Sequence, residues 1–198
     1  MKLATTVLSM GIATWFTTAA TVYAQDAGAM VQRNANQQQR IEQGLQSGAL
    51  NTREASRLER EESQVERMQS RALRDGNVSD AEKARINAAQ DRVSRDIYRE
   101  KHDAQTGNPN SASSQRMHAD VQRNINQQNR IEQGIQSGQL TNRETGRLER
   151  GQARVNRVEA NAGRDGHVGL NEQRRMQNAE NRQSQRIFRE KHDKQVRN

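Results

Sequence analysis

A block of 75 residues occurs twice in this chain, and this duplication constrains the fold more than any other feature. Residues 31–105 align with residues 121–195 without a gap and are identical at about 40 positions. The copies begin VQRNANQQQRIEQGLQSGAL and VQRNINQQNRIEQGIQSGQL. Both copies are therefore expected to adopt the same fold, and the features that both retain are candidates for what that fold requires.

Each copy has the pattern of three amphipathic helices. In the first copy they are predicted over residues 31–45, 52–74 and 80–103, where apolar residues recur at helical spacing. The second helix has apolar residues seven positions apart, namely Leu58, Val65 and Ala72. Gly146 and Gly151 lie inside the matching helix of the second copy, and each is expected to cost that helix up to about 1 kcal/mol relative to Ala.

Short turns with clear stop and start signals separate these helices. Gly48 and Gly76 are placed where a glycine in the left-handed conformation often ends a helix. Asn51 and Glu54 then have the spacing of a capping box, and Thr141 begins the matching signal in the second copy. Short turns between long helices favour antiparallel neighbours. The predicted fold class is therefore all-α, a tandem duplication of an antiparallel three-helix unit.

The two copies are expected to form separate units. Residues 31–105 and 121–195 are the predicted three-helix units. Residues 106–120 have the composition of a linker, since they are rich in Ser and Asn and contain the only proline, Pro109.

The first 24 residues have the composition of a secretory signal peptide. Lys2 is followed by a mostly apolar, uncharged stretch over residues 3–20, and Ala24 is the small residue that suits signal peptidase. Cleavage is predicted near Ala24, and the mature chain is expected to be periplasmic or secreted. An uncleaved N-terminal helix is the alternative. No later segment is apolar enough to span a membrane.

The composition excludes several classes of function. The chain has no cysteine, which excludes disulfides, cysteine-based zinc sites and thiol catalysis. Hydrophobic residues make up 31% of the chain and aromatic residues 3%, enough for seams between helices but too few for a thick core. No nucleophile–base–acid set and no phosphate-binding loop is recognisable. An enzyme, a cofactor and a small-molecule substrate are therefore not expected.

The net charge of +8 is unevenly distributed between the copies. Residues 31–105 contain 14 Lys/Arg and 13 Asp/Glu, whereas residues 121–195 contain 15 and 9. The basic second copy favours an anionic partner, such as lipid headgroups or polyanionic glycans, although solubility alone would also explain the charge. Nucleic acid is a less favoured partner, because no aromatic residues interleave with the arginines to stack on bases.

A row of arginines is the main candidate for a binding site. Its members in the second copy are Arg147, Arg150, Arg154, Arg157 and Arg164. They recur mostly every three or four residues and face away from the apolar side of their predicted helix. In the first copy four glutamates flank the corresponding row, namely Glu59, Glu61, Glu62 and Glu66. Of these, only Glu59 has a glutamate, Glu149, at the matching position of the second copy. The unflanked row is predicted to bind phosphates or carboxylates. An ordinary solvated helix face is the alternative.

The turn DGNVSDAE resembles the second half of an EF-hand calcium loop, and the matching turn of the second copy resembles it too. The positions that carry the resemblance are Asp75, Gly76, Val78 and Glu82, with Asp165, Gly166, Val168 and Glu172. The resemblance implies a calcium ligand set that includes Asp75, Glu82, Asp165 and Glu172. Earlier loop positions depart from the family, since Arg71 stands where a carboxylate is needed. A helix stop joined to a capping box explains the same residues, so no metal is expected.

The segment LTNRE from Leu140 is similar to the LTxxQ motif of periplasmic chaperones of the Spy and CpxP type. The looser segment LNTRE begins at Leu50. The resemblance covers only these five-residue segments, and it implies the binding of unfolded clients on a cradle of helices.

Taken together, these patterns predict an exported, non-enzymatic helical protein that engages an anionic envelope component or a protein partner. A periplasmic stress chaperone and an EF-hand-derived, calcium-responsive protein are the alternatives. The pairs His102-Asp103 and His192-Asp193 recur at the end of each copy, and we interpret them as the ends of helices, where a protonated histidine interacts well with the helix dipole.

Overall fold

The structure is a computed structural model that describes the backbone of residues 18–193 and the side chains from Asp26 onward. Six helices form this part of the chain: α1 (Thr18–Ser47), α2 (Thr52–Ala72), α3 (Asp80–Lys101), α4 (Ala112–Gln136), α5 (Asn142–Ala162) and α6 (Leu170–Lys191). No strand occurs among the described residues, so the predicted all-α class is confirmed. Most of the predicted signal peptide, residues 1–17, lies outside the described residues. None of the described helices is both long and apolar enough to cross a membrane.

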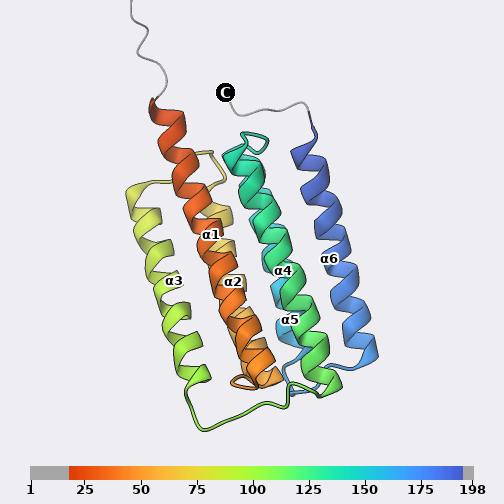
Figure 1. Cartoon of the computed structure of the whole chain (residues 1–198). Helices are drawn as coiled ribbons and strands as arrows, with labels where there is room; N and C mark the ends of the chain where they lie inside the picture. Colours follow the sequence, from red (N-terminus) through yellow and green to blue (C-terminus); the bar gives the residue numbers. More distant parts are fainter. Residues whose placement is uncertain (1–17, 194–198) are drawn as a thin grey trace, which may run out of the picture.

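The axes of the helices are roughly aligned in a single bundle (Figure 1). α1 and α4 lie side by side, α2 and α5 pack together behind them, and α3 and α6 flank the bundle on opposite sides. Each central pair contains one helix from each copy, and its two members run antiparallel. The inner four helices therefore bring the copies together, while α3 and α6 each contact helices of their own copy.

Our expectation of two separate units is wrong, because the most extensive packing in the molecule joins the copies through α2 with α5 and α1 with α4. The predicted linker is also shorter than expected, since α4 begins at Ala112. The connection before it is docked on the first copy, where the Gly107 amide donates to the Gly48 carbonyl over 2.8 Å. The apolar stripes recognised in the sequence are only one of two buried faces on the central helices.

The second buried face of α2 and α5 is built from small residues. On α2 it consists of Ser56, Ser63 and Ser70, and on α5 of Gly146, Ala153 and Ala160. These are equivalent positions in the two copies, seven residues apart, so each set forms one stripe along its helix. Small side chains let two helix backbones approach closely. The Ser63 hydroxyl donates directly to the Ala153 carbonyl over 2.9 Å.

Gly146 inside α5 and Gly163 at its end are explained by this close approach, whereas Gly151 faces Gln183 of α6. A Cβ atom at Gly146 would lie 2.9 Å from the Cβ of Leu73, and one at Gly163 would lie 3.0 Å from the Cβ of Ser56. Gly146 is the counterpart of Ser56, and Gly163 is the counterpart of Leu73. The two contacts are thus the same contact made twice, and a glycine stands on one side of each. The helix propensity lost at Gly146 is the cost of this packing.

The core has two apolar regions separated by a polar layer. Both apolar clusters contain residues from both copies, for example Leu58 with Ile125 in one and Leu73 with Leu148 in the other. Polar side chains on α1 and α4 lie between the residues of these clusters. The side chains of this polar layer are Asn34, Gln37, Gln38, Asn124, Gln127 and Gln128, each at most 3% exposed. The layer is therefore shared by the two copies.

The predicted turn and cap signals are present. Gly48, Gly76, Gly138 and Gly166 have φ angles of 76°, 92°, 73° and 89°, the left-handed region that favours glycine. Capping boxes begin α2 at Asn51, α3 at Ser79 and α5 at Thr141.

Candidate anion-binding face

The arginine row predicted from the second copy lies on the outer side of α5. All five of its members, Arg147, Arg150, Arg154, Arg157 and Arg164, are exposed. Arg147 has a carboxylate partner, since its Nη1 lies 3.3 Å from Glu190 Oε2. Within the part of the chain that the structure describes, the other four guanidinium groups form no ion pair, so an external anion can reach them.

The glutamates expected beside the corresponding row of α2 do not flank it. Glu59, Glu62 and Glu66 are fully buried, and Glu61 is half-buried. Gln38 of α1 donates to Glu59 over 2.9 Å, and its α4 counterpart Gln128 donates to Glu66 over 2.9 Å. The glutamates point inward because this face of α2 packs against the other central helices. They therefore do not neutralise the arginines of the first copy, and this part of our prediction is wrong.

The buried carboxyls of α2 and α5, several of which accept hydrogen bonds from the polar layer, are poor anions. Burial raises the pKa of Glu59 and of Glu149 to about 8. Burial, together with the neighbouring carboxyls, raises the pKa of Glu62, Glu66 and Glu159 well above the usual range. Side-chain amides donate to four of them, Glu59, Glu66, Glu149 and Glu159, whereas Glu62 has no hydrogen-bond donor among the described residues. None of the five forms an ion pair with a described Lys or Arg. At neutral pH the uncharged form is favoured, so each such group makes the net charge more positive than the formal +8.

The second copy is nevertheless the more basic, because α6 differs from α3 on its exposed side. Asp80, Asp91 and Asp96 of α3 correspond to Leu170, Asn181 and Arg186 of α6. All three aspartates lie at least partly at the surface. The asymmetry of charge between the copies, predicted from α2 and α5, is therefore produced on the surface mainly by α3 and α6.

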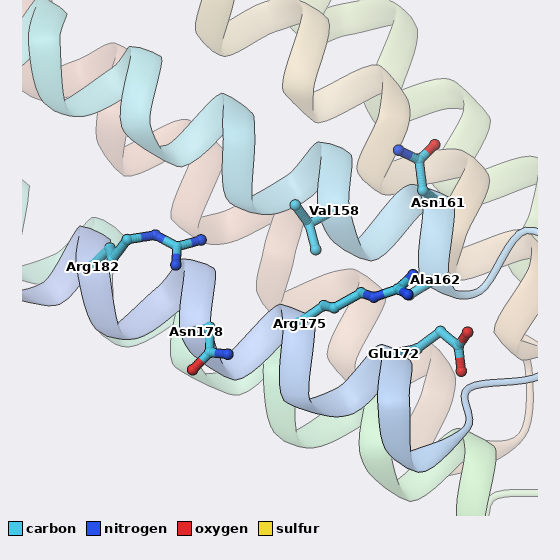
Figure 2. A pocket seen from close by; sticks show the side chains of 7 residues that line it. All are labelled: Val158, Asn161, Ala162, Glu172, Arg175, Asn178 and Arg182. Atoms are coloured by element: carbon cyan, nitrogen blue, oxygen red, sulfur yellow. The ribbon is translucent and has the colours of Figure 1, made fainter.

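A groove of about 500 Å³ runs between α5 and α6 beside the arginine row. Its lining consists of Val158, Asn161, Ala162, Glu172, Arg175, Asn178 and Arg182. In Figure 2 the side chains of Arg175 and Arg182 rise from α6 toward α5, where Val158 projects toward them. The groove thus combines two guanidinium groups, two amides and the carboxylate of Glu172 with a small apolar wall. The sequence analysis missed Arg175 and Arg182 because the pairing of α5 with α6 across this face was not used.

The four residues of the EF-hand-like turns have local partners. Asp75 Oδ1 accepts from the Asn77 amide over 3.0 Å, and the equivalent Asp165 Oδ1 accepts from the His167 amide over 2.9 Å. Glu82 and Glu172 each accept from the backbone amide at the start of their helix, in both cases over 3.0 Å. These are turn and capping contacts. The calcium-binding role implied by the resemblance stays a prediction for these residues.

Each of these turns is also held by an arginine of the other copy. Arg143 Nη2 donates to the Asp75 carbonyl over 3.2 Å, and Arg53 Nη2 donates to the Asp165 carbonyl over 2.9 Å. Arg53 and Arg143 are equivalent residues, so the same contact is made twice, once from each copy to the other. A guanidinium group at the carbonyl of each turn stabilises the contact between the copies.

The segment that resembles the chaperone motif begins α5. Leu140 is fully buried, and the side chain of Thr141 takes part in a capping box with Glu144. Leu140 packs against Gly134, where an added Cβ would lie 2.6 Å from Leu140 Cδ1. Buried packing and capping therefore account for these residues.

Comparison of the chain with protein-family models, curated proteins and solved structures gives no match. The resemblances to EF-hand loops and to periplasmic chaperones stay predictions.

Proposed function

We propose that this chain is an exported, non-enzymatic helical protein that binds an anionic partner through the basic face of α5 and α6. The observation that carries the proposal is the row formed by Arg150, Arg154, Arg157 and Arg164, which has no ion pair among the described residues and borders a groove lined by further arginines.

The chemistry of this face suits a partner that carries several phosphate or carboxylate groups. A guanidinium group can donate two parallel hydrogen bonds to either anion. Residues three or four apart on a helix have Cβ atoms about 5–6 Å apart, so the row offers repeated contacts to a repeated charge. Anionic lipid headgroups at a membrane surface present such a repeat.

Two exposed apolar side chains at the ends of α6 favour a lipid surface over a purely ionic polymer. Leu170 is 63% exposed and Phe188 is 56% exposed. The first copy has Asp80 in place of Leu170, so only α6 combines arginines with an apolar residue at both ends. Arginine with exposed apolar residues is typical of surfaces that rest on anionic bilayers.

The experiment is co-sedimentation of the mature chain with vesicles of phosphatidylglycerol and phosphatidylcholine. The test variant replaces four arginines of the second copy by glutamine: R150Q, R157Q, R175Q and R182Q. The internal repeat supplies a matched control with the same loss of charge: R60Q, R67Q, R85Q and R92Q. All eight residues are at least partly exposed, so both variants are expected to fold.

We expect binding to phosphatidylglycerol vesicles that weakens steeply with salt. The test variant should lose at least tenfold in affinity, and the control variant several times less. Equal losses would show that net charge alone drives binding and would contradict a specific face. Binding to soluble polyphosphate but not to vesicles would identify a polymeric anion as the partner in place of the membrane.

A further inference from the structure

Two clusters of carboxylates occupy equivalent places at opposite ends of the bundle. In the first copy, Glu54, Glu100 and Asp103 each place one oxygen atom within 4.8 Å of the others. In the second copy, the cluster consists of Glu144, Glu190 and Asp193. Each lies where the start of one helix meets the end of another, α2 with α3 at the lower end of Figure 1 and α5 with α6 at the upper end.

The first cluster contains a buried carboxylate oxygen that lacks a donor. Glu54 is 1% exposed, and its Oε2 accepts from the Asn51 amide over 2.9 Å as part of the capping box. Its Oε1 is buried and has no hydrogen-bond partner among the residues that the structure describes. Burial raises the pKa of Glu54, and the nearby charges of Asp103 and Glu100 raise it further. Glu144 repeats this arrangement, since it is 1% exposed and its Oε1 also has no hydrogen-bond partner within the described part of the chain.

The charge of the cluster is only partly balanced. Arg57 Nη1 donates to both oxygens of Glu100, over 3.0 and 3.2 Å. One guanidinium group against three carboxylates leaves an excess of two negative charges when all three are ionised. A divalent cation would balance this excess and would satisfy the buried oxygen of Glu54, whose desolvation otherwise has no compensation.

Oxygen ligands at this spacing fit calcium. A set made only of carboxylate oxygens selects hard cations over zinc. Calcium–oxygen distances of about 2.3–2.6 Å give a coordination sphere about 5 Å across, whereas that of magnesium is about 4 Å across. Oxygens up to 4.8 Å apart can therefore contact one calcium ion with little movement. Asp103 is exposed, so water can complete the coordination.

We propose that each cluster binds one calcium ion, so that the chain has two equivalent calcium sites, each joining two helix ends of one copy. The internal repeat supports this assignment. All three carboxylates and the paired arginine are retained in the second copy, although nearly half of the aligned positions differ. Capping explains Glu54 and ion pairing explains Glu100. Asp103 Oδ1 accepts from the Gln105 amide over 2.7 Å, but this turn contact does not require Asp103 to meet the other two carboxylates.

These sites are distinct from the EF-hand-like turns and from the anion-binding face. Asp75 and Asp165 lie at the ends of α2 and α5, whereas Glu54 and Glu144 lie at the starts of the same helices. The sequence analysis missed the clusters because Glu54 and Glu100 are 46 positions apart in the printed chain, and only the packing of α2 on α3 brings them together.

The test is isothermal titration of the mature chain with calcium chloride at pH 7.5. We expect two calcium ions per chain, with a Kd on the order of 10⁻⁴–10⁻³ M as in extracellular calcium modules. Asp103→Asn should weaken one site at least tenfold, and Asp193→Asn the other. Both residues are exposed, so these variants should remain folded. The double variant D75N/D165N is the control and should retain both sites.

Calcium should also raise the melting temperature of the chain, and D103N together with D193N should abolish the increase. Absence of binding at millimolar calcium would overturn the proposal. Binding that survives D103N/D193N but is lost in D75N/D165N would place calcium in the EF-hand-like turns and would overturn it as well.

Discussion

The side-chain amide of Asn156 donates a hydrogen bond to the carboxyl of Glu66 over 3.0 Å, and these two residues occupy the same position in the two copies. A contact between equivalent residues lies close to the axis that relates the copies. The interface between α2 and α5 is thus an intramolecular counterpart of the self-complementary interface of a twofold dimer. Its centre is polar, and the stability of the bundle therefore depends on how that centre is protonated.

We predict that the protein loses stability as the pH rises from about 4.5 to about 8. The pKa of Glu59 and of Glu149 is about 8 in the folded chain, against a usual value of 4.5. The stability that this difference contributes is fully present below about pH 4.5 and is lost as the pH rises through about 8. Since one pKa unit corresponds to about 1.4 kcal/mol, each group should contribute a few kcal/mol. Urea unfolding at pH 5 and pH 9 measures the loss.

Replacing these carboxyls by amides should remove much of that dependence. Glu59→Gln retains an acceptor for Gln38, and E149Q retains one for Asn34, but neither side chain can ionise. The double variant should be more stable than the original protein at pH 9 and close to it only near pH 4.5, where both carboxyls are protonated in the folded chain and begin to ionise in the unfolded chain. An unchanged slope of stability against pH would show that other groups dominate.

We predict strong coupling between Gly146 and Leu73. Gly146→Ser should destabilise the chain by about 1–3 kcal/mol, because the new Cβ would press on that of Leu73. Leu73→Gly should cost more, since it empties a fully buried site. The double variant copies the natural pair Ser56 and Gly163. Its loss, measured by urea unfolding, should be well below the sum of the two single losses. Additive losses would mean that the two residues do not pack on each other.

We predict that Arg53 controls the mobility of a turn in the other copy. Arg53→Ala removes a hydrogen bond to the Asp165 carbonyl, and R143A removes the equivalent bond to Asp75. Each variant should speed amide hydrogen exchange in the turn of the opposite copy and leave the turn of its own copy unchanged. The two variants are controls for each other. Faster exchange in the turn of the same copy would contradict the docking of the turns across the interface.

Helices, turns and caps could be predicted from the sequence because their signals are local. The predicted start of α2 at Thr52 and of α3 at Asp80 is confirmed by the structure, and Leu58, Val65 and Ala72 are buried as expected. α1 extends well before the predicted start at Val31, and Ala27 and Met30 in this extension are buried in the core.

The association of the copies was not predicted, because it rests on residues that are usually exposed. Glu59, Glu62 and Glu66 were placed in water, since glutamate is seldom buried without a cationic partner. Here burial is tolerated because amides satisfy some oxygens and the raised pKa values favour the neutral form. The stripe of small residues on α2 and α5 is the sequence signal from which a close helix pair could have been predicted. Of the candidate site, the exposure of the α5 arginines was predicted, and the groove beside them was not.

The central claim is that both copies fold as one bundle across the interface of α2 with α5. Tyr98→Trp and Phe188→Trp place a fluorophore at equivalent exposed positions on α3 and α6, and residues 25–198 contain no other tryptophan. Urea unfolding followed by each fluorophore and by circular dichroism should give coincident transitions with one midpoint. If one copy unfolded at a lower urea concentration while the other stayed folded, the copies would be separate units and the claim would be contradicted.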